Sequence, residues 1–358
     1  MRISLCGAGA SFSTKDVETG YLKALRRAGH DVSHYALDAR IDVSGSFLHH
    51  AWEAGGRATA QPTAADVVYH ASVGILERAL RHDAAWVVVI SAMLLHPDAL
   101  IMLKRAGLKV ALVLTESPYD DDKQARVLPH ADAVFTNERT SVRHLGALHP
   151  RVSYLGACYD PETHRPEPPD DEPDVAAHDV VFVGTGFPER VALLAAVPWA
   201  DLGIDLGLYG TWETVADEHP LRPYVRGGVI DNRTTAALYR RAKVGLNLYR
   251  RDVDFDRGPG DRAAKARIRL AESLNPRAVE LAACRVFHVS DHRREVAETF
   301  GDLVPAFDGP RQLAKVLADA LAAPCARREI AARLPGAVRG MSFDDRAREL
   351  VARLEATG

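Results

Sequence analysis

Short apolar runs alternate with amphipathic segments along most of the chain. In the first half the apolar runs occupy residues 2–9, 30–37, 65–72, 85–91, 108–115, 132–136 and 152–157, and we predict a strand at each. Between them, segments such as residues 16–29 and 98–109 have the apolar spacing of an amphipathic helix. Strands that are apolar throughout and separated by helices are typical of a parallel sheet covered on both faces. The pattern therefore predicts an α/β fold.

A segment rich in proline and acidic residues interrupts this alternation. Residues 160–178 contain five prolines, which is typical of a linker between domains. After it the alternation resumes, with predicted strands at residues 179–186, 204–210, 243–249 and 285–291. We therefore predict two doubly wound, Rossmann-like domains that face each other across a cleft. Open parallel sheets bind ligands beyond the carboxyl ends of their strands, so we expect the chemistry there.

The predicted boundaries follow from the position of the linker. Residues 1–160 form an N-terminal domain, residues 161–178 the linker and residues 179–340 a C-terminal domain. Residues 341–358 are expected to form a helix that packs back on the N-terminal domain.

Composition narrows the class of protein. The chain has 358 residues, 47% of them hydrophobic, which is enough for two domains with buried cores. A formal net charge of −3 provides no global basic field for nucleic acid or an anionic membrane. Four scattered cysteines without a CxxC pair argue against a disulfide framework or a zinc site. With no signal-peptide pattern and no apolar run long enough to span a bilayer, we expect a cytoplasmic protein.

Two glutamates, Glu272 and Glu280, stand with seven residues between them and with Asn275 and Pro276 in the middle. Proline suits the first position of a helix, so a helix is expected to begin at Pro276 with Asn275 or Ser273 as its cap. Glu272 then lies in the loop before the helix and Glu280 lies one turn inside it. The free N–H groups and positive dipole end of a helix N-terminus favour an anion such as a phosphate. The arrangement is suited to a ligand that is part phosphate and part polyol.

The first apolar run offers a competing phosphate site. It ends in Gly7-Ala8-Gly9, which half matches the glycine fingerprint of dinucleotide-binding folds. Phe12 occupies the position of the third glycine, and the acidic residue expected further on would be Asp38, which comes late. An NAD site at this turn is therefore a weak alternative to a plain tight turn.

The loop at residues 250–269 and a glutamate in the first half supply further candidates. Asp252, Asp254 and Asp256 alternate as in the Asp-x-Asp of metal-dependent sugar transferases, so a metal-bound diphosphate is one interpretation. Seven basic residues in the same loop favour neutralisation of a diphosphate by arginine without metal, and a solvated loop is the third alternative. Glu116 follows a predicted strand, at the end where catalytic groups of such sheets lie.

The glutamate pair resembles the Glu-x7-Glu motif of retaining glycosyltransferases with the GT-B fold, in which two Rossmann-like domains face each other. Other blocks are similar, in chain order, to those of the CgeB-like spore-protein family of these enzymes. The blocks are LVLTESPYDDD, VSYLGACYDPETHRP, DVVFVGTGFPER, NRTTAALYRRAKVGLNLYR and SLNPRAVELAACRVFHVSD, which span most of residues 108–310. The resemblance implies the GT-B fold and a glycosyltransferase of bacterial or phage type.

Carried over to this sequence, the resemblance implies a donor site. Glu280 would bind the ribose hydroxyls of the nucleotide, and Glu272 would hold hydroxyls of the donor sugar. The backbone N–H groups of Arg277 and Ala278, which follow the cap Asn275, would cradle the diphosphate together with the Arg277 side chain.

The resemblance extends to the first strand of the second domain, with one departure further along. Gly184 and Gly186 would let phosphate or sugar approach the backbone, and Arg190 would be a further phosphate contact. The family usually has glycine where Arg285 follows Cys284, so the helix cannot end on a simple left-handed glycine cap.

The predicted reaction is transfer of a sugar from a nucleoside diphosphate sugar to an acceptor hydroxyl, with retention and without metal. A UDP- or GDP-sugar is the co-substrate, and no tightly bound cofactor is expected. The acceptor is a glycan, a small molecule, a protein or a modified base, and neither a stable nucleic-acid complex nor a transmembrane segment is expected. The candidate catalytic residues are Glu272, Arg277 and Glu116, and the acceptor-side candidates are His70, Tyr119 and Asp120.

Two alternatives from other classes share the same fold, because fold does not fix the reaction. One is a nucleotide-sugar epimerase or phosphorylase. The other is a non-catalytic protein that binds a nucleotide or a carbohydrate.

Overall fold

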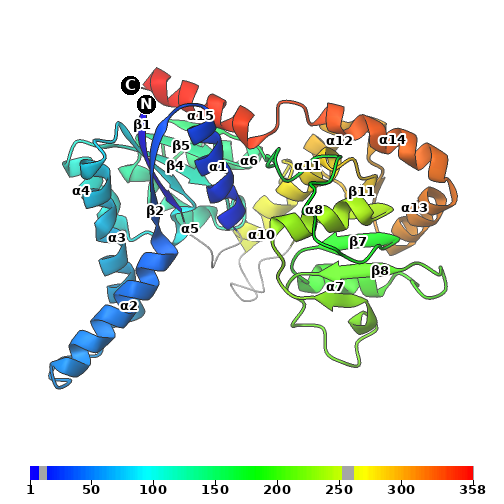
Figure 1. The fold of residues 1–358 in the computed structure, drawn as a ribbon, viewed down its shortest axis with the longest axis horizontal. Coiled ribbons are helices and arrows are strands. Elements are labelled where there is room, and N and C mark those ends of the chain that lie inside the picture. The colour runs from blue at the N-terminus through cyan, green and yellow to red at the C-terminus, as the bar shows by residue number, and fades with distance from the viewer. Residues whose placement is uncertain (8–13, 252–261, 358) are drawn as a thin grey trace. The chain divides into compact units, whose positions relative to one another are not determined.

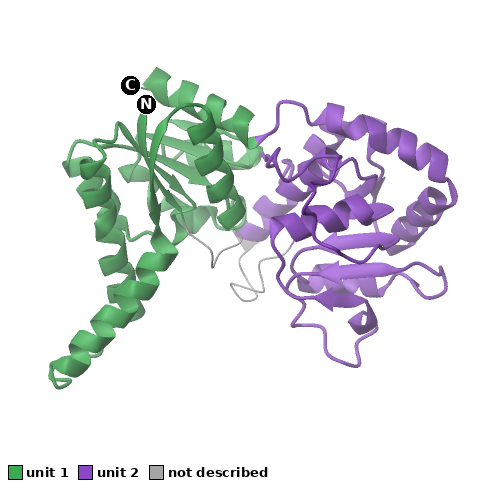
Figure 2. Cartoon of the chain, viewed as in Figure 1, with its two compact units in different colours: residues 1–156, 343–358 green, residues 157–342 purple. Residues whose placement is uncertain are grey.

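The computed structural model describes residues 1–7, 14–251 and 262–357, and the chain divides into two compact units (Figure 1, Figure 2). Unit 1 comprises residues 1–156 and 343–358, and unit 2 comprises residues 157–342. Each unit has a parallel sheet with helices on both sides and its own hydrophobic core.

Unit 1 is built on a parallel sheet in the strand order β2-β1-β3-β4-β5-β6. The central strands are apolar throughout because helices cover both of their faces. The described strands are β1 (Arg2–Gly7), β2 (Asp31–Ala36), β3 (Trp86–Ile90), β4 (Lys109–Leu114), β5 (Ala133–Thr136) and β6 (Val152–Tyr154). The described helices are α1 (Lys15–Arg27), α2 (Leu37–Ala54), α3 (Ala64–Arg81), α4 (Pro97–Arg105), α5 (Asp121–Ala125), α6 (Arg139–Gly146) and α15 (Phe343–Thr357).

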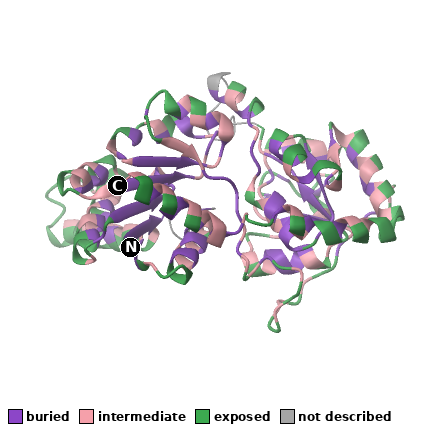
Figure 3. Cartoon of the chain, turned by 90° about the horizontal axis from the view of Figure 1, so that it is seen from above, coloured by how far each residue is buried: buried purple, intermediate pink, exposed green. Residues whose placement is uncertain are grey.

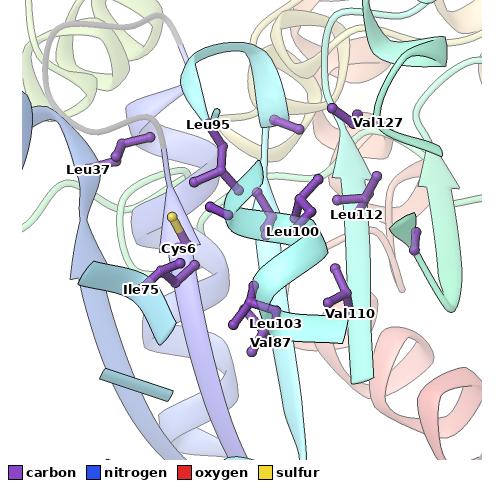
Figure 4. Close-up of a cluster of buried hydrophobic side chains, with 14 of the residues drawn as sticks. Cys6, Leu37, Ile75, Val87, Leu95, Leu100, Leu103, Val110, Leu112 and Val127 are labelled. Atoms are coloured by element: carbon purple, nitrogen blue, oxygen red, sulfur yellow. The ribbon is translucent and has the colours of Figure 1, made fainter. Parts of the chain in front are cut away.

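The core of unit 1 lies between this sheet and the helices α3 and α4. Figure 4 shows Ile75 of α3 and Leu100 and Leu103 of α4 packed toward Val87 and Leu112 of the sheet. The burial pattern follows this layering, because the strands are almost entirely buried while the outer faces of the helices are exposed (Figure 3). The apolar strands are therefore fixed by packing, and their carboxyl ends are held at one edge of the sheet.

The strand predicted at residues 65–72 is wrong, because these residues belong to α3. Thr63 accepts a hydrogen bond from the N–H of Asp66, and the Asp66 side chain accepts one from the N–H of Thr63. This capping box starts a helix of 18 residues, in which Ala71 and Ile75 are buried one turn apart. The two β-branched residues in this eight-residue window favour a strand, whereas the buried positions over the full 18 residues have the period of a helix.

The last helix, α15, belongs to unit 1 although it follows unit 2 in the chain. It packs on α1, where the rings of Tyr21 and Phe343 meet edge to face at 5.3 Å. Asp344 accepts a hydrogen bond of 2.6 Å from the Arg27 guanidinium. The two ends of the chain therefore complete one unit.

Unit 2 repeats the architecture in the strand order β12-β11-β10-β7-β8-β9. The described strands are β7 (Val180–Val183), β8 (Leu206–Tyr209), β9 (Val225–Gly227), β10 (Val244–Asn247), β11 (His288–Asp291) and β12 (Ala306–Phe307). The described helices are α7 (Pro188–Ala195), α8 (Asn232–Arg241), α10 (Arg262–Arg269), α11 (Pro276–Ala283), α12 (Arg294–Phe300), α13 (Pro310–Ala322) and α14 (Pro324–Ala337). In the part of the chain that the structure describes, no helix is long and apolar enough to cross a membrane.

Candidate functional site

The start of α11 has the predicted form. Pro276 is the first helical residue, and the Asn275 side chain accepts a hydrogen bond of 3.0 Å from the N–H of Ala278. Glu272 precedes the helix and Glu280 lies inside it, as the proline position indicates. Because Asn275 already engages the Ala278 N–H, that group is not available to a diphosphate unless the cap opens.

Arg277, the second residue of α11, reaches across the carboxyl edge of the unit 2 sheet. Its Nε donates to the carbonyl of Val183 at 2.8 Å, and its Nη1 donates to the carbonyl of Leu248 at 3.1 Å. The guanidinium lies 4.5 Å from the centroid of the Phe182 ring. Arg277 therefore ties α11 to the ends of β7 and β10 and fixes a positive charge between them.

Arg190 on α7 reinforces the same junction. Its guanidinium donates to Thr185 at 2.9 Å and to the same Leu248 carbonyl at 2.8 Å. The side chain packs over the Phe187 ring at 4.9 Å, and the residue is 7% exposed. Two guanidinium groups thus share one carbonyl at the end of β10, which makes this edge a positively charged junction.

The glycines after β7 and β8 are required by close packing. Gly184 has φ +156°, and a Cβ on it would lie 2.5 Å from the Arg277 guanidinium. A Cβ on Gly186 would lie 2.5 Å from the ring of Trp212, and one on Gly210 would collide with the carbonyl of Gly184. In this structure the space beside the two predicted glycines is filled by Arg277 and Trp212.

The two glutamates of the motif point to different neighbours. Glu272 has 26% of its side chain exposed and lies 3.8 Å from the guanidinium of Arg294 on α12. Glu280 is half-buried on α11, which packs against α8, the helix that carries Tyr239. Burial raises the pKa of the Tyr239 hydroxyl, the Glu280 carboxylate raises it further, and a hydrogen bond with Arg277 opposes the shift. The Tyr239 hydroxyl thus responds to the charges of both Glu280 and Arg277.

α11 ends in a way that the sequence did not predict. Arg285 adopts φ +60°, the left-handed conformation that usually selects glycine. Its N–H donates to Ala282 at 3.0 Å, and the N–H of Val286 donates to Leu281 at 3.0 Å, which together form a Schellman cap. The cap is therefore left-handed but is formed by Arg285 instead of a glycine.

One carboxylate is buried among the arginines of this edge. Asp291, at the end of β11, is 4% exposed and accepts hydrogen bonds of 3.1 Å from the Tyr249 N–H and the Arg251 Nε. Burial raises the pKa of the Asp291 carboxyl, and the Arg251 charge lowers it in part. The described residues contain no group of three or more His, Cys, Asp or Glu that could hold a metal. The acids Asp252, Asp254 and Asp256 lie outside the described residues.

A pocket of about 420 Å³ opens beside this junction, at the ends of β8 and β9. Its side chains come from the loop after β8 and from the segment around β9, and it has a mixed charge. The charged lining residues are Glu213, Arg222 and Arg226. Sequence reasoning missed this pocket, because only the fold brings these two segments together.

In unit 1 the predicted acceptor-side residues separate into two places. Glu116, Tyr119 and Asp120 lie in the loop after β4, where the Asp120 N–H donates to the Glu116 carbonyl at 3.0 Å. His70 lies on α3, with its Nδ1 3.0 Å from the Ser44 hydroxyl on α2. The predicted strand that placed His70 at a sheet edge does not exist, so the positional reason for that choice is lost.

An acid of α1 packs against Gly7, the last residue of β1. The carboxyl group of Glu18, on α1, occupies the position that a Cβ on Gly7 would take. Glu18 is 1% exposed and pairs with His34 and with Lys15. The remaining residues of the turn, Gly9 and Phe12 included, lie outside the described residues.

These features define a protein with two doubly wound domains, of which the second has an arginine-lined edge at a helix N-terminus. Solved structures share the fold over the whole chain. A sucrose-phosphate synthase from Thermosynechococcus elongatus has a TM-score of 0.59 at 15% identity, with 100% of both chains covered. A glycosyltransferase of avilamycin A biosynthesis has a TM-score of 0.57 at 17% identity, covering 98% of this chain and 96% of its own. A trehalose-6-phosphate synthase reaches a TM-score of 0.64 at 12% identity, with 99% of both chains covered.

At these identities the likeness establishes the fold, and the predicted GT-B architecture is confirmed. Residues 190–352 match the family model described as glycosyl transferase-like, and the match confirms the predicted class of enzyme, a glycosyltransferase. No curated protein sequence matches the chain.

Proposed function

We propose that unit 2 binds a nucleoside diphosphate sugar at its carboxyl edge and that unit 1 supplies the acceptor side. The observation that carries this proposal is the junction of Arg190 and Arg277 on the carbonyl of Leu248, beside the N-terminus of α11. Both guanidinium groups are held by backbone carbonyls and rings, so their charges are fixed before a ligand arrives. Negative charge grows on the leaving diphosphate during transfer, and preorganised positive charge stabilises it.

The two glutamates would bind the ribose and the sugar of the donor. Glu280 faces α8 and would accept hydrogen bonds from the ribose hydroxyls, because one carboxylate can accept two hydrogen bonds from a vicinal diol. Glu272 faces α12 and would hold hydroxyls of the donor sugar. Arg277 would both place its positive charge beside the diphosphate and position α11, because its Nε and Nη1 hold the carbonyls of Val183 and Leu248.

The proposal also specifies the stereochemistry of transfer, the absence of a metal, the donor and the acceptor. Retention is supported by the spacing of Glu272 and Glu280, and a metal-free step is supported by the arginine junction. A UDP- or GDP-sugar is the proposed donor, since one neighbouring structure is described with UDP-2-fluoro glucose bound. The proposed acceptor is a glycan, a small molecule, a protein or a modified base contacted by Glu116, Tyr119 or Asp120. The proposed location is cytoplasmic, which four scattered cysteines without a CxxC pair support.

The test is thermal stabilisation by a panel of nucleoside diphosphates and their sugars, with and without a chelator. A ligand at a hundred times its Kd adds about 2.7 kcal/mol to the free energy of unfolding. We expect one nucleotide family to raise the Tm, the chelator to change nothing, and Glu280→Ala to abolish the shift. Glu329→Ala, an exposed acid on α14, is the matched control and should keep the full shift.

Product analysis then decides the reaction. Transfer with retention gives a product whose anomeric configuration, read by NMR, equals that of the donor. Conversion of the donor sugar to another sugar without any acceptor would instead show an epimerase and overturn the proposal. Stabilisation by none of the nucleotides would remove the donor site altogether.

A further inference from the structure

The pocket beside β8 and β9 shares a wall with the glycine turn of the proposed donor site. The N–H of Gly184 donates to Tyr209 at 2.9 Å, and the N–H of Gly210 donates to Gly228 at 3.0 Å. Gly210 and Gly228 line the pocket, while Gly184 packs against Arg277. The pocket therefore lies beside the proposed donor site, at the same edge of the sheet.

The direction in which the donor extends follows from the neighbours of the two glutamates. Glu272 pairs with Arg294 on α12, which follows β11, whereas the helix of Glu280 packs against α8, which packs on β7. A sugar held by Glu272 and a ribose held by Glu280 place the nucleobase on the β7 side of the junction. Strands β7 and β8 are neighbours, and β8 is two strands from β10, about 10 Å away. The base then reaches the pocket.

The pocket walls carry both an acceptor and several donors. Glu213 is exposed, and among the residues that the structure describes it has no hydrogen-bond or salt-bridge partner. Arg222 lies 3.1 Å from Asp217, and Arg226 lies 3.2 Å from Asp205. Each guanidinium carries five N–H donors, so one ion pair leaves donors for a ligand. A volume of about 420 Å³ is within the usual range for a small-molecule site.

Guanine matches this set of groups better than uracil does. Its Watson–Crick edge presents adjacent N–H donors, which suit the two oxygens of a carboxylate, and its O6 and N7 accept hydrogen bonds from a guanidinium. Uracil has a single N–H between two carbonyl oxygens, and those oxygens would face the Glu213 carboxylate as like charges.

We propose that Glu213 and the arginines of this pocket select guanine, so that the donor is a GDP-sugar. The inference rests on the proposed donor site and adds the identity of the base. Glu213 is then the residue that determines specificity, while the diphosphate lies at the arginine junction.

The experiment is calorimetric titration of the full chain with GDP, IDP and UDP. IDP differs from GDP only in lacking the exocyclic amino group, so it probes the contact with Glu213. A hydrogen bond to a charged group is worth about 10- to 100-fold in affinity, so we expect GDP to bind at least about tenfold more tightly than IDP or UDP. Glu213→Gln should weaken GDP by a similar factor and leave UDP unchanged.

Glu218→Gln is the matched control, because Glu218 is exposed in the same loop but does not line the pocket. It should bind all three nucleotides as the unmodified chain does. UDP that binds as tightly as GDP, or a Glu213→Gln variant with unchanged affinity for GDP, would overturn the choice of guanine while leaving the donor site intact. Failure of every nucleotide to bind would overturn the donor site itself.

Discussion

The two units share one architecture, yet their first strands end beside opposite charges. β1 ends in Gly7, against which the buried carboxyl group of Glu18 packs. β7 is followed by Gly184, against which the guanidinium of Arg277 packs. In both turns glycine is needed because a charged side chain occupies the place of a Cβ. The sign of that charge is what differs.

This difference separates the roles that the two units can take. In unit 1 the charge that packs against Gly7 is the carboxylate of Glu18, which is 1% exposed. A phosphate at unit 2 would meet Arg190 and Arg277 instead. The positive charge favours a diphosphate at unit 2, whereas most of the first turn of unit 1, on which the NAD alternative depends, lies outside the described residues.

The largest effect is expected when the positive charge at unit 2 is removed. Arg277→Met keeps the packing over Phe182 but leaves the Val183 carbonyl without its guanidinium donor. Loss of charge and positioning together should weaken nucleoside diphosphate binding about 100-fold and lower the free energy of unfolding by about 2–3 kcal/mol. Calorimetric titration and urea unfolding measure the two quantities.

Arg27→Met in unit 1 is the matched control, because it breaks the hydrogen bond to Asp344 without touching unit 2. It should leave nucleotide affinity unchanged. Undiminished affinity in Arg277→Met would show that the charge beside Gly184 does not govern binding.

A smaller effect should follow from adding one methyl group to each glycine. Gly184→Ala drives a Cβ against Arg277, and Gly7→Ala drives one against Glu18. Overpacking of this kind should cost each variant about 1–3 kcal/mol of stability. Only Gly184→Ala should also lose nucleotide affinity, by about tenfold or about 1.4 kcal/mol, because it displaces the arginine. Equal losses of affinity in the two variants would remove the distinction between the units.

The sequence predicted those parts of the site that depend on neighbouring residues. The start of α11 follows from Asn275 and Pro276 alone, and the strands follow from their apolar runs except for β9 and β12, two short edge strands of unit 2 that the pattern did not predict. The contacts of Arg277 could not be predicted, since the Val183 carbonyl lies 94 positions earlier in the chain. The pocket around Glu213 likewise needs two loops that only the fold brings together. The prediction failed at α3, because residues 65–72 taken alone resemble a strand although they belong to a helix.

The smallest effect concerns how helices end in the two units. In unit 1, α1 and α4 end in Schellman caps with Gly29 at φ +81° and Gly107 at φ +79°. The same cap holds a residue other than glycine in α3 of unit 1, with Asp83 at φ +47°, and in α11 of unit 2, with Arg285 at φ +60°. A side chain in this conformation costs about 1–2 kcal/mol, and glycine avoids the cost while gaining some freedom in the unfolded chain.

Arg285→Gly should therefore raise the free energy of unfolding of unit 2 by about 1 kcal/mol, or its Tm by about 2–4 °C. Arg285→Ala keeps a Cβ in the left-handed conformation and should change stability by less than about 0.5 kcal/mol. Because Arg285 is exposed and lies at the far end of α11 from Asn275, both variants should bind nucleotide as the parent does. A Gly variant no more stable than the Ala variant would mean that the cap of α11 carries no strain.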